Sequence, residues 1–286
     1  MPWTQATRAQ YRRDHLAQAS DLYDSEWAKI APLLPPPAAR GRPRTTDLRA
    51  VVEALLFVLG TGCQWRALPR GLYPPFTTVQ GYFYRWRRSG LWQSLREHLV
   101  GEARQAHGRA QAPSAGVIDT QSVPATESGG VRGLDPAKRI KGRKRHLVTD
   151  TNGLPLALRV HAANRQDVHE AAPLLIAVGQ RFPQLRHVFA DRVYRGQGLL
   201  NALAAGGQAG WTVDIVARPP GVKGFALLPR RWVIERTFAW LNRCRRLAKC
   251  HERLTVNEEA WIDLAAIRLL ARRLARNTKK AKPKPI

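Results

Sequence analysis

Apolar residues recur at helical spacing through the first third of the chain and are separated by short polar breaks. Between Val51 and Leu59 an apolar residue returns every third or fourth position, after Thr46 or Asp47 as an N-cap and before a glycine. The same criteria predict three further helices, over residues 24–33, 77–88 and 91–107. Short helices with tight turns predict a small all-α, helix-turn-helix-like domain over residues 1–112.

The pattern changes after about residue 113, where short apolar runs alternate with helical segments. The runs predict five strands, at residues 116–123, 146–150, 156–160, 188–191 and 212–216. Asn152 and Gly153 form a hairpin signal between the second and third strands. Helices are predicted at residues 167–181, 196–206 and 230–248. This order indicates an α/β domain over residues 113–275, with a mixed five-stranded sheet and flanking helices.

The overall charge narrows the class of function. The 286 residues include 47 Lys and Arg against 21 Asp and Glu, which gives a formal net charge of +26. Such a charge argues against an ordinary metabolic enzyme and implies a polyanionic partner. A hydrophobic fraction of 44% and nine Trp exclude wholesale disorder. The basic end, residues 276–286, is expected to be a disordered tail.

Membrane association and export are not expected. The apolar runs are far shorter than the roughly 20 residues that span a bilayer, and the N-terminus has no signal-peptide core. Three cysteines suit a reducing compartment, so a cytoplasmic protein is expected. Cys244, Cys250 and His251 lack the spacing of a zinc site.

Basic residues in three segments are candidates for contact with DNA. The helix predicted at 77–88 interleaves aromatic and basic residues and ends in Arg85, Arg87 and Arg88, which also fit an ordinary solvated face. An extended connector contributes Arg42 and Arg44. The third segment holds six basic residues in eight positions: Lys138, Arg139, Lys141, Arg143, Lys144 and Arg145. It predicts DNA contact, with a localisation signal or a solvated turn as alternatives.

Three carboxylates are candidates for chemistry. Asp119 stands inside the first predicted strand, where an ionised group needs a partner, and Asp191 ends the fourth strand at the carboxyl edge of the sheet. Glu235 lies on a partly apolar helical face, four residues after Arg231. Together they suit a divalent cation bound through oxygen. The alternatives are a loop cap for a strand-end Asp and a surface ion pair between Arg231 and Glu235.

The sequence resembles the DDE transposases of bacterial insertion sequences, specifically the insertion-sequence "five" family within the "four" superfamily. The resemblance covers residues 24–275 and rests on motifs at residues 41–44, 62–66, 117–123, 146–155, 162–167, 190–196 and 231–241. It implies an RNase H-like catalytic domain in which Asp119, Asp191 and Glu235 are the metal-binding triad. It also implies a bacterial, nucleoid-associated protein whose partner is double-stranded DNA, both terminal inverted repeats and target, with no small-molecule substrate.

Two features depart from the family pattern. The family signature around Glu235 retains Arg231, but Asn242 stands where a Lys is expected. Arg243 is the candidate to make the phosphate contact of that missing Lys. Cys250, His251 and Glu252 stand where family members tend to have Asp-Tyr-Glu.

The reaction expected from the resemblance is cleavage of DNA followed by strand transfer. Two Mg²⁺ ions roughly 3.5–4 Å apart, for which Mn²⁺ can substitute, would activate water and stabilise the leaving 3′ oxygen. A homodimer is expected on DNA, because one chain has a single triad and two ends must be joined. Two alternatives stay open: an inactive or repurposed sequence-specific DNA-binding protein, and a metal-dependent nuclease without strand transfer.

Overall fold

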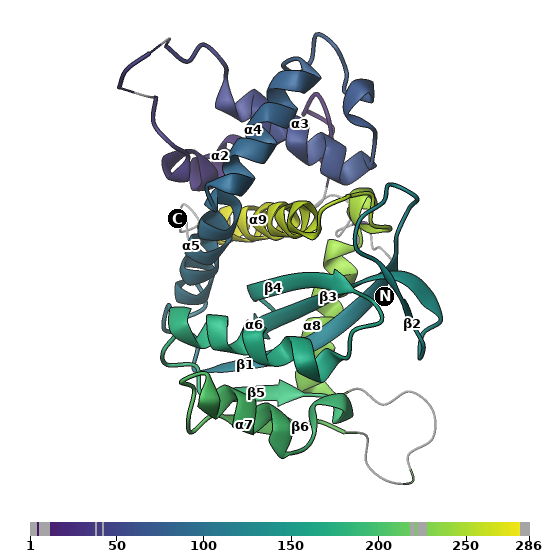
Figure 1. Cartoon of the computed structure of the whole chain (residues 1–286). Helices are drawn as coiled ribbons and strands as arrows, with labels where there is room; N and C mark the ends of the chain where they lie inside the picture. Colours follow the sequence, from purple (N-terminus) through teal and green to yellow (C-terminus); the bar gives the residue numbers. More distant parts are fainter. Residues whose placement is uncertain are drawn as a thin grey trace.

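The structure, a computed structural model, describes residues 5, 12–37, 39–41, 43–217, 221 and 228–280. A group of helices from the N-terminal part lies at one end of the molecule, and a mixed sheet with flanking helices lies at the other (Figure 1). The long helix near the C-terminus, α9 (Thr255–Lys280), runs between them. In the described part of the chain, no helix is both long enough and apolar enough to cross a membrane.

The four helices predicted before residue 113 are confirmed. The helical elements of this part are α2 (Asp24–Ile30), η1 (Ala31–Leu33), α3 (Leu48–Thr61), η2 (Trp65–Ala67), α4 (Phe76–Arg88) and α5 (Leu91–Gln105). The Asp47 carboxylate caps α3 by accepting from the Arg49 N–H at 2.8 Å, and Gly62 closes it with φ 73°. The helical region is therefore present, while its helix-turn-helix-like role stays a prediction.

The predicted α/β, RNase H-like class is confirmed by a mixed sheet with helices on both faces. Its strands are β1 (Ala115–Pro124), β2 (Gly133–Asp135), β3 (Ile140–Asp150), β4 (Pro155–Ala162), β5 (His187–Ala190) and β6 (Thr212–Ile215). Their order is β2-β3-β1-β5-β6, with β4 also paired to β3. β1 and β3 are antiparallel, whereas β1, β5 and β6 are mutually parallel. The sheet has six strands rather than five, because the short β2 forms a hairpin with an unexpected extension of β3.

The helices of the sheet region are α6 (Asp167–Arg181), η3 (Arg192–Tyr194), α7 (Gln197–Ala205), α8 (Pro229–Leu241) and η4 (Arg245–Leu247). The prediction of a helix to residue 248 is wrong, since α8 ends at Leu241. After it the chain turns, buries Cys244 and Leu247, and packs η4 against α3. The apolar residues that extended the helical pattern therefore serve a different element.

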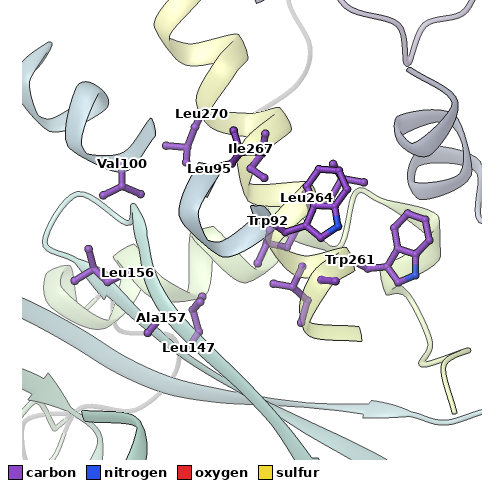
Figure 2. Close-up of a cluster of buried hydrophobic side chains, with 14 of the residues drawn as sticks. Trp92, Leu95, Val100, Leu147, Leu156, Ala157, Trp261, Leu264, Ile267 and Leu270 are labelled. Atoms are coloured by element: carbon purple, nitrogen blue, oxygen red, sulfur yellow. The ribbon is translucent and has the colours of Figure 1, made fainter. Parts of the chain in front are cut away.

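The 26-residue helix α9 was not predicted, and it joins the two halves of the molecule. It packs against α2, α3, α4 and α5 on one side and against β4 and α8 on the other. Figure 2 shows one apolar cluster built from α5 (Trp92, Leu95, Val100), the sheet (Leu147, Leu156, Ala157) and α9 (Trp261, Leu264, Ile267, Leu270). The helix reaches Lys280, so residues 276–280 of the expected tail are helical and residues 281–286 lie outside the described part. The boundaries at residues 112 and 275 stay predictions.

The basic run predicted to contact DNA lies partly inside the protein. Arg143, Lys144 and Arg145 belong to β3 and are buried. Glu258 of α9 pairs with Arg143 at 3.4 Å and with Arg145 at 2.8 Å, and Lys144 pairs with Asp167 at 2.7 Å. The expectation that these three residues contact DNA is therefore wrong, because their charges are buried and already paired.

Candidate active site

Asp119 of β1 and Asp191, which directly follows β5, lie just beyond the last residues that pair these two parallel strands. In the β1–β5 ladder Val117 is paired with Phe189, so Asp119 and Asp191 each follow two residues later. Asp119 accepts from the Thr120 N–H at 2.7 Å, and Asp191 accepts from the Val193 N–H at 2.9 Å. The parallel register therefore places both residues at the carboxyl end of β5, beside β1, in the region where open α/β sheets bind ligands.

The third carboxylate is brought to this edge by the hairpin between β3 and β4. The Thr237 hydroxyl donates to the Gly153 carbonyl at 2.8 Å, and Arg236 donates to the Asn152 carbonyl at 2.9 Å. Gly153 has φ 84°, and a Cβ there would lie 2.7 Å from the Thr237 hydroxyl oxygen, so glycine is required for this contact. The turn that the sequence predicted therefore also docks α8 over β1, and Glu235 of this helix shares Arg231 with Asp119.

Arg231 links the carboxylates electrostatically. Its guanidinium lies 3.9 Å from Asp119 and 3.5 Å from Glu235, whose side chain is 46% exposed. The pKa of Asp119 is raised to about 6, chiefly by burial and also by the charge of Asp191, against the opposing effects of the Thr120 N–H, Arg231 and Lys138. A largely buried carboxylate beside a second one favours a positively charged partner.

The donor set fits a hard divalent cation by its chemistry, because all three side chains offer carboxylate oxygens. Arg231 connects Asp119 to Glu235, and Asp191 acts on Asp119 through its charge. Within the described residues, however, no three His, Cys, Asp or Glu side chains are gathered closely enough to hold a metal ion in this arrangement. The three residues therefore suit the cation in chemical type, whereas their spacing in this structure does not form a coordination site.

The remaining candidates for DNA contact fall into distinct environments. Exposed side chains are Arg44, Arg85, Arg88, Lys138, Arg139, Lys141 and Arg243. Arg44 donates to the Pro35 carbonyl at 2.9 Å, and Arg87 donates to Asn257 at the start of α9. Arg243 lies beyond the end of α8, after Asn242. Arg42 lies outside the described residues.

Sequence reasoning missed a buried polar cluster beneath the carboxylates. The Thr120 hydroxyl donates to Asp167 at 2.9 Å, and His146 Nε2 lies 2.7 Å from the Tyr194 hydroxyl. Asp167 is the first residue of α6, after the N-cap position of Gln166, and its carboxylate accepts the hydrogen bond from Thr120. The signal available in the sequence was that Thr120 and His146 stand at strand positions where apolar residues are expected.

The buried imidazole of His146 predicts a loss of stability in mild acid. Burial, together with His161, lowers the pKa of His146 well below its ordinary value of 6.5. As the pH falls below 6.5, His146 takes up a proton in the unfolded chain but not in the folded protein. The free energy of unfolding should therefore decrease by up to about 1.4 kcal/mol per pH unit. Urea denaturation at several pH values measures this decrease. The free energy of unfolding of His146→Gln should decrease less steeply with falling pH. An identical slope in the variant and the wild type would show that His146 is not the cause.

The fold and this edge define a class: an RNase H-like domain with acidic residues on adjacent strands and a following helix, joined to a basic helical region. Residues 110–270 match the family described as "Transposase DDE domain", so the chain belongs to that family. Residues 22–96 match "Putative transposase of IS4/5 family". This agrees with the resemblance drawn from the sequence.

Two relatives from Burkholderia cepacia match parts of the chain. "Putative transposase for insertion sequence element IS402" is 36% identical over 140 residues, which cover 46% of this chain and 64% of that protein. "Insertion element IS402 uncharacterized 16.2 kDa protein" is 33% identical over 124 residues, which cover 41% of this chain and 83% of that protein. The first alignment thus spans less than two thirds of that relative.

Proposed function

We propose that this protein is a transposase that binds the ends of an insertion sequence and catalyses divalent-metal-dependent DNA cleavage and strand transfer. The observation that carries the proposal is the placement of Asp119 and Asp191 just beyond the last pair between the parallel strands β1 and β5, with Arg231 between Asp119 and Glu235. Membership of the DDE family supports the same reaction.

Asp119, Asp191 and Glu235 would hold the metal, which we propose to be two Mg²⁺ ions. When bound, such ions activate water and stabilise a leaving oxygen at a phosphodiester. Arg231 lies within reach of two of these carboxylates and supplies a guanidinium suited to a phosphate oxygen. The active-site edge thus combines acidic groups for the cation with a basic group for DNA.

The path of DNA is proposed to follow the exposed basic residues on both sides of this edge. Lys138, Arg139 and Lys141 lie in and beside the β2–β3 turn, and Lys138 is close enough to lower the pKa of Asp119. Arg243 follows α8, and Arg44, Arg85 and Arg88 belong to the N-terminal part. Phosphates attract such residues without regard to base sequence.

Metal-dependent transfer of a labelled end into plasmid DNA tests the function. Joined products support a transposase. Cleaved but unjoined ends would favour a nuclease, and binding without cleavage would favour an inactive or repurposed DNA-binding protein. The ends to use are the inverted repeats that flank the gene. We place this activity in the bacterial cytoplasm at the nucleoid, consistent with the free cysteines Cys63, Cys244 and Cys250.

A double replacement of Arg85 and Arg88 by Ala should weaken binding to end DNA. Both side chains are exposed at the end of α4, whereas Arg87 is held by Asn257, so the two outer arginines are the ones available to phosphates. We expect a loss of about tenfold or more at low salt, measured by fluorescence anisotropy, and a smaller salt dependence. The control is Arg12→Ala, because Arg12 is an exposed arginine that pairs with Asp14. Equal affinities of the double variant and the wild type for end DNA would refute the contact.

End DNA should also promote formation of a homodimer. A protein of net charge +26 repels itself, with a field that salt screens over about 10 Å at 0.1 M, and DNA neutralises that charge. Light scattering with and without an end duplex measures the change. A strict complex of one protein with one duplex at micromolar concentration would argue against a dimeric assembly.

A further inference from the structure

A directed chain of hydrogen bonds runs beneath the two aspartates. The Tyr194 hydroxyl lies 2.7 Å from His146 Nε2, and His146 Nδ1 lies 3.3 Å from His161 Nε2. His161 Nδ1 lies 3.0 Å from the Ala162 carbonyl oxygen. All three side chains are buried: Tyr194 is 2% exposed, His146 0% and His161 5%. Buried polar groups of this kind need hydrogen-bond partners, and here each group has one within the protein.

The carbonyl at the far end fixes the direction of every bond. A carbonyl oxygen only accepts, so His161 Nδ1 carries the proton and, in the neutral ring, Nε2 is an acceptor. His146 Nδ1 must then donate to it, which leaves His146 Nε2 to accept from the Tyr194 hydroxyl. Burial lowers the pKa of both imidazoles, and burial with the nearby carboxylates raises that of Tyr194, so the three groups stay neutral at physiological pH.

The two ends of this chain belong to the segments that carry the aspartates. Tyr194 is the last residue of η3, whose N-cap is Asp191, and its N–H donates to the Asp191 carbonyl. His146 is paired in the β1–β3 ladder with Thr120, the residue next to Asp119. The bond from Tyr194 to His146 therefore ties the segment of Asp191 to the strands that hold Asp119.

Backbone pairing alone does not make this connection. The β1–β5 ladder ends at Val117 and Phe189, two residues before either aspartate, whereas the β1–β3 ladder continues past Asp119. Asp119 is thus held by β3, but Asp191 lies beyond the last pair that β5 makes with β1. A side-chain tie is needed at that point if the spacing of the two carboxylates is to be fixed.

A second side-chain contact, between Thr120 and Asp167, lies on the same face of the sheet as the Tyr194–His146 bond. Successive residues of a strand point to opposite faces, so Asp119 faces Arg231 of α8 while Thr120 faces α6. There the Thr120 hydroxyl donates to Asp167, which Lys144 neutralises at 2.7 Å. β1 is therefore anchored on the face opposite to the carboxylates, next to the Tyr194–His146 bond.

From this arrangement we infer that Tyr194, oriented by His146 and His161, is a positioning residue that sets the spacing of Asp119 and Asp191. The inference rests on the proposed function, since the spacing matters for holding a divalent cation between the two carboxylates. Tyr194 does not touch the cation. It restrains the segment from which Asp191 projects.

Mn²⁺ binding to the full-length protein without DNA, measured by calorimetry, tests this role. Tyr194→Phe keeps the ring and removes only the hydroxyl, and the Mn²⁺ affinity should fall about tenfold, the loss typical of groups that orient metal ligands. Tyr73→Phe is the matched control, because Tyr73 is a buried phenol that donates to Asp21 at 2.6 Å in the N-terminal part. It should bind Mn²⁺ as the wild type does. Affinity of Tyr194→Phe within twofold of the wild type would overturn the inference.

A second pair of variants applies if Tyr194→Phe does not fold. His146→Gln keeps an acceptor for the Tyr194 hydroxyl, whereas His146→Leu removes it, so only the leucine variant should lose about tenfold in affinity. Equal affinities of the two would contradict the role of the tie. Wild-type protein that binds no Mn²⁺ would contradict the proposed function and this inference together. Normal wild-type binding with unchanged variants would contradict the inference alone.

Discussion

Replacing Asp119 or Asp191 with Ala should abolish metal-dependent cleavage of end DNA, and Glu235→Ala should do the same. Each change removes a carboxylate from the edge where β1, β5 and α8 meet, and two remaining ligands cannot hold the ions as three do. Affinity for end DNA should stay within about fourfold of the wild type, because basic groups supply it. Gel assays of cleavage in Mg²⁺, with anisotropy for binding, separate the two effects.

Asp214→Ala provides the matched control for this experiment. Asp214 is an exposed carboxylate of the same sheet, on β6, and its partner is His187 at 3.2 Å. The Asp214→Ala substitution removes the same charge but leaves the proposed site intact, so cleavage should be unchanged. Retention of more than about one tenth of wild-type cleavage by any of the three variants would show that residue to be misassigned.

Replacing Glu258 with Ala should destabilise the whole protein. Its carboxylate is buried and pairs with two guanidiniums of β3, those of Arg143 and Arg145, which are also buried. Removal leaves both positive charges buried without their carboxylate, a change that costs about 3–5 kcal/mol for a broken buried pair. Urea denaturation, with the midpoint and slope both recorded, measures the loss.

Glu127→Ala is the corresponding surface control. Glu127 pairs with Arg132 at 3.0 Å, but its side chain is 86% exposed, so water replaces the lost contact. Its free energy of unfolding should match that of the wild type. A loss of less than about 1 kcal/mol for Glu258→Ala would mean that Arg143 and Arg145 find other partners or reach solvent.

Local sequence patterns determined much of the architecture. The hydrophobic spacing located the helices near residues 24–33, 48–61, 76–88 and 91–105, the alternating runs located five strands, and Asn152-Gly153 located the hairpin. The same level of reasoning placed Asp119 and Asp191 on neighbouring strands, and in the structure β1 and β5 are parallel neighbours. The large positive charge indicated a polyanionic partner, because the net charge is a sum over the residues and does not depend on how the chain folds.

Only the tertiary structure decided which charges face solvent. Lys141 and Arg145 belong to one basic run, yet Lys141 is exposed and Arg145 is buried against Glu258, which lies 113 residues later in the chain. The sequence shows the charge but not the distant partner that makes its burial tolerable. For the same reason it did not reveal that α9 joins the helical region to the sheet, or that Gly153 docks α8 beside Asp119. These features depend on contacts between residues far apart in the chain, and a pattern read over ten or twenty positions contains no information about them.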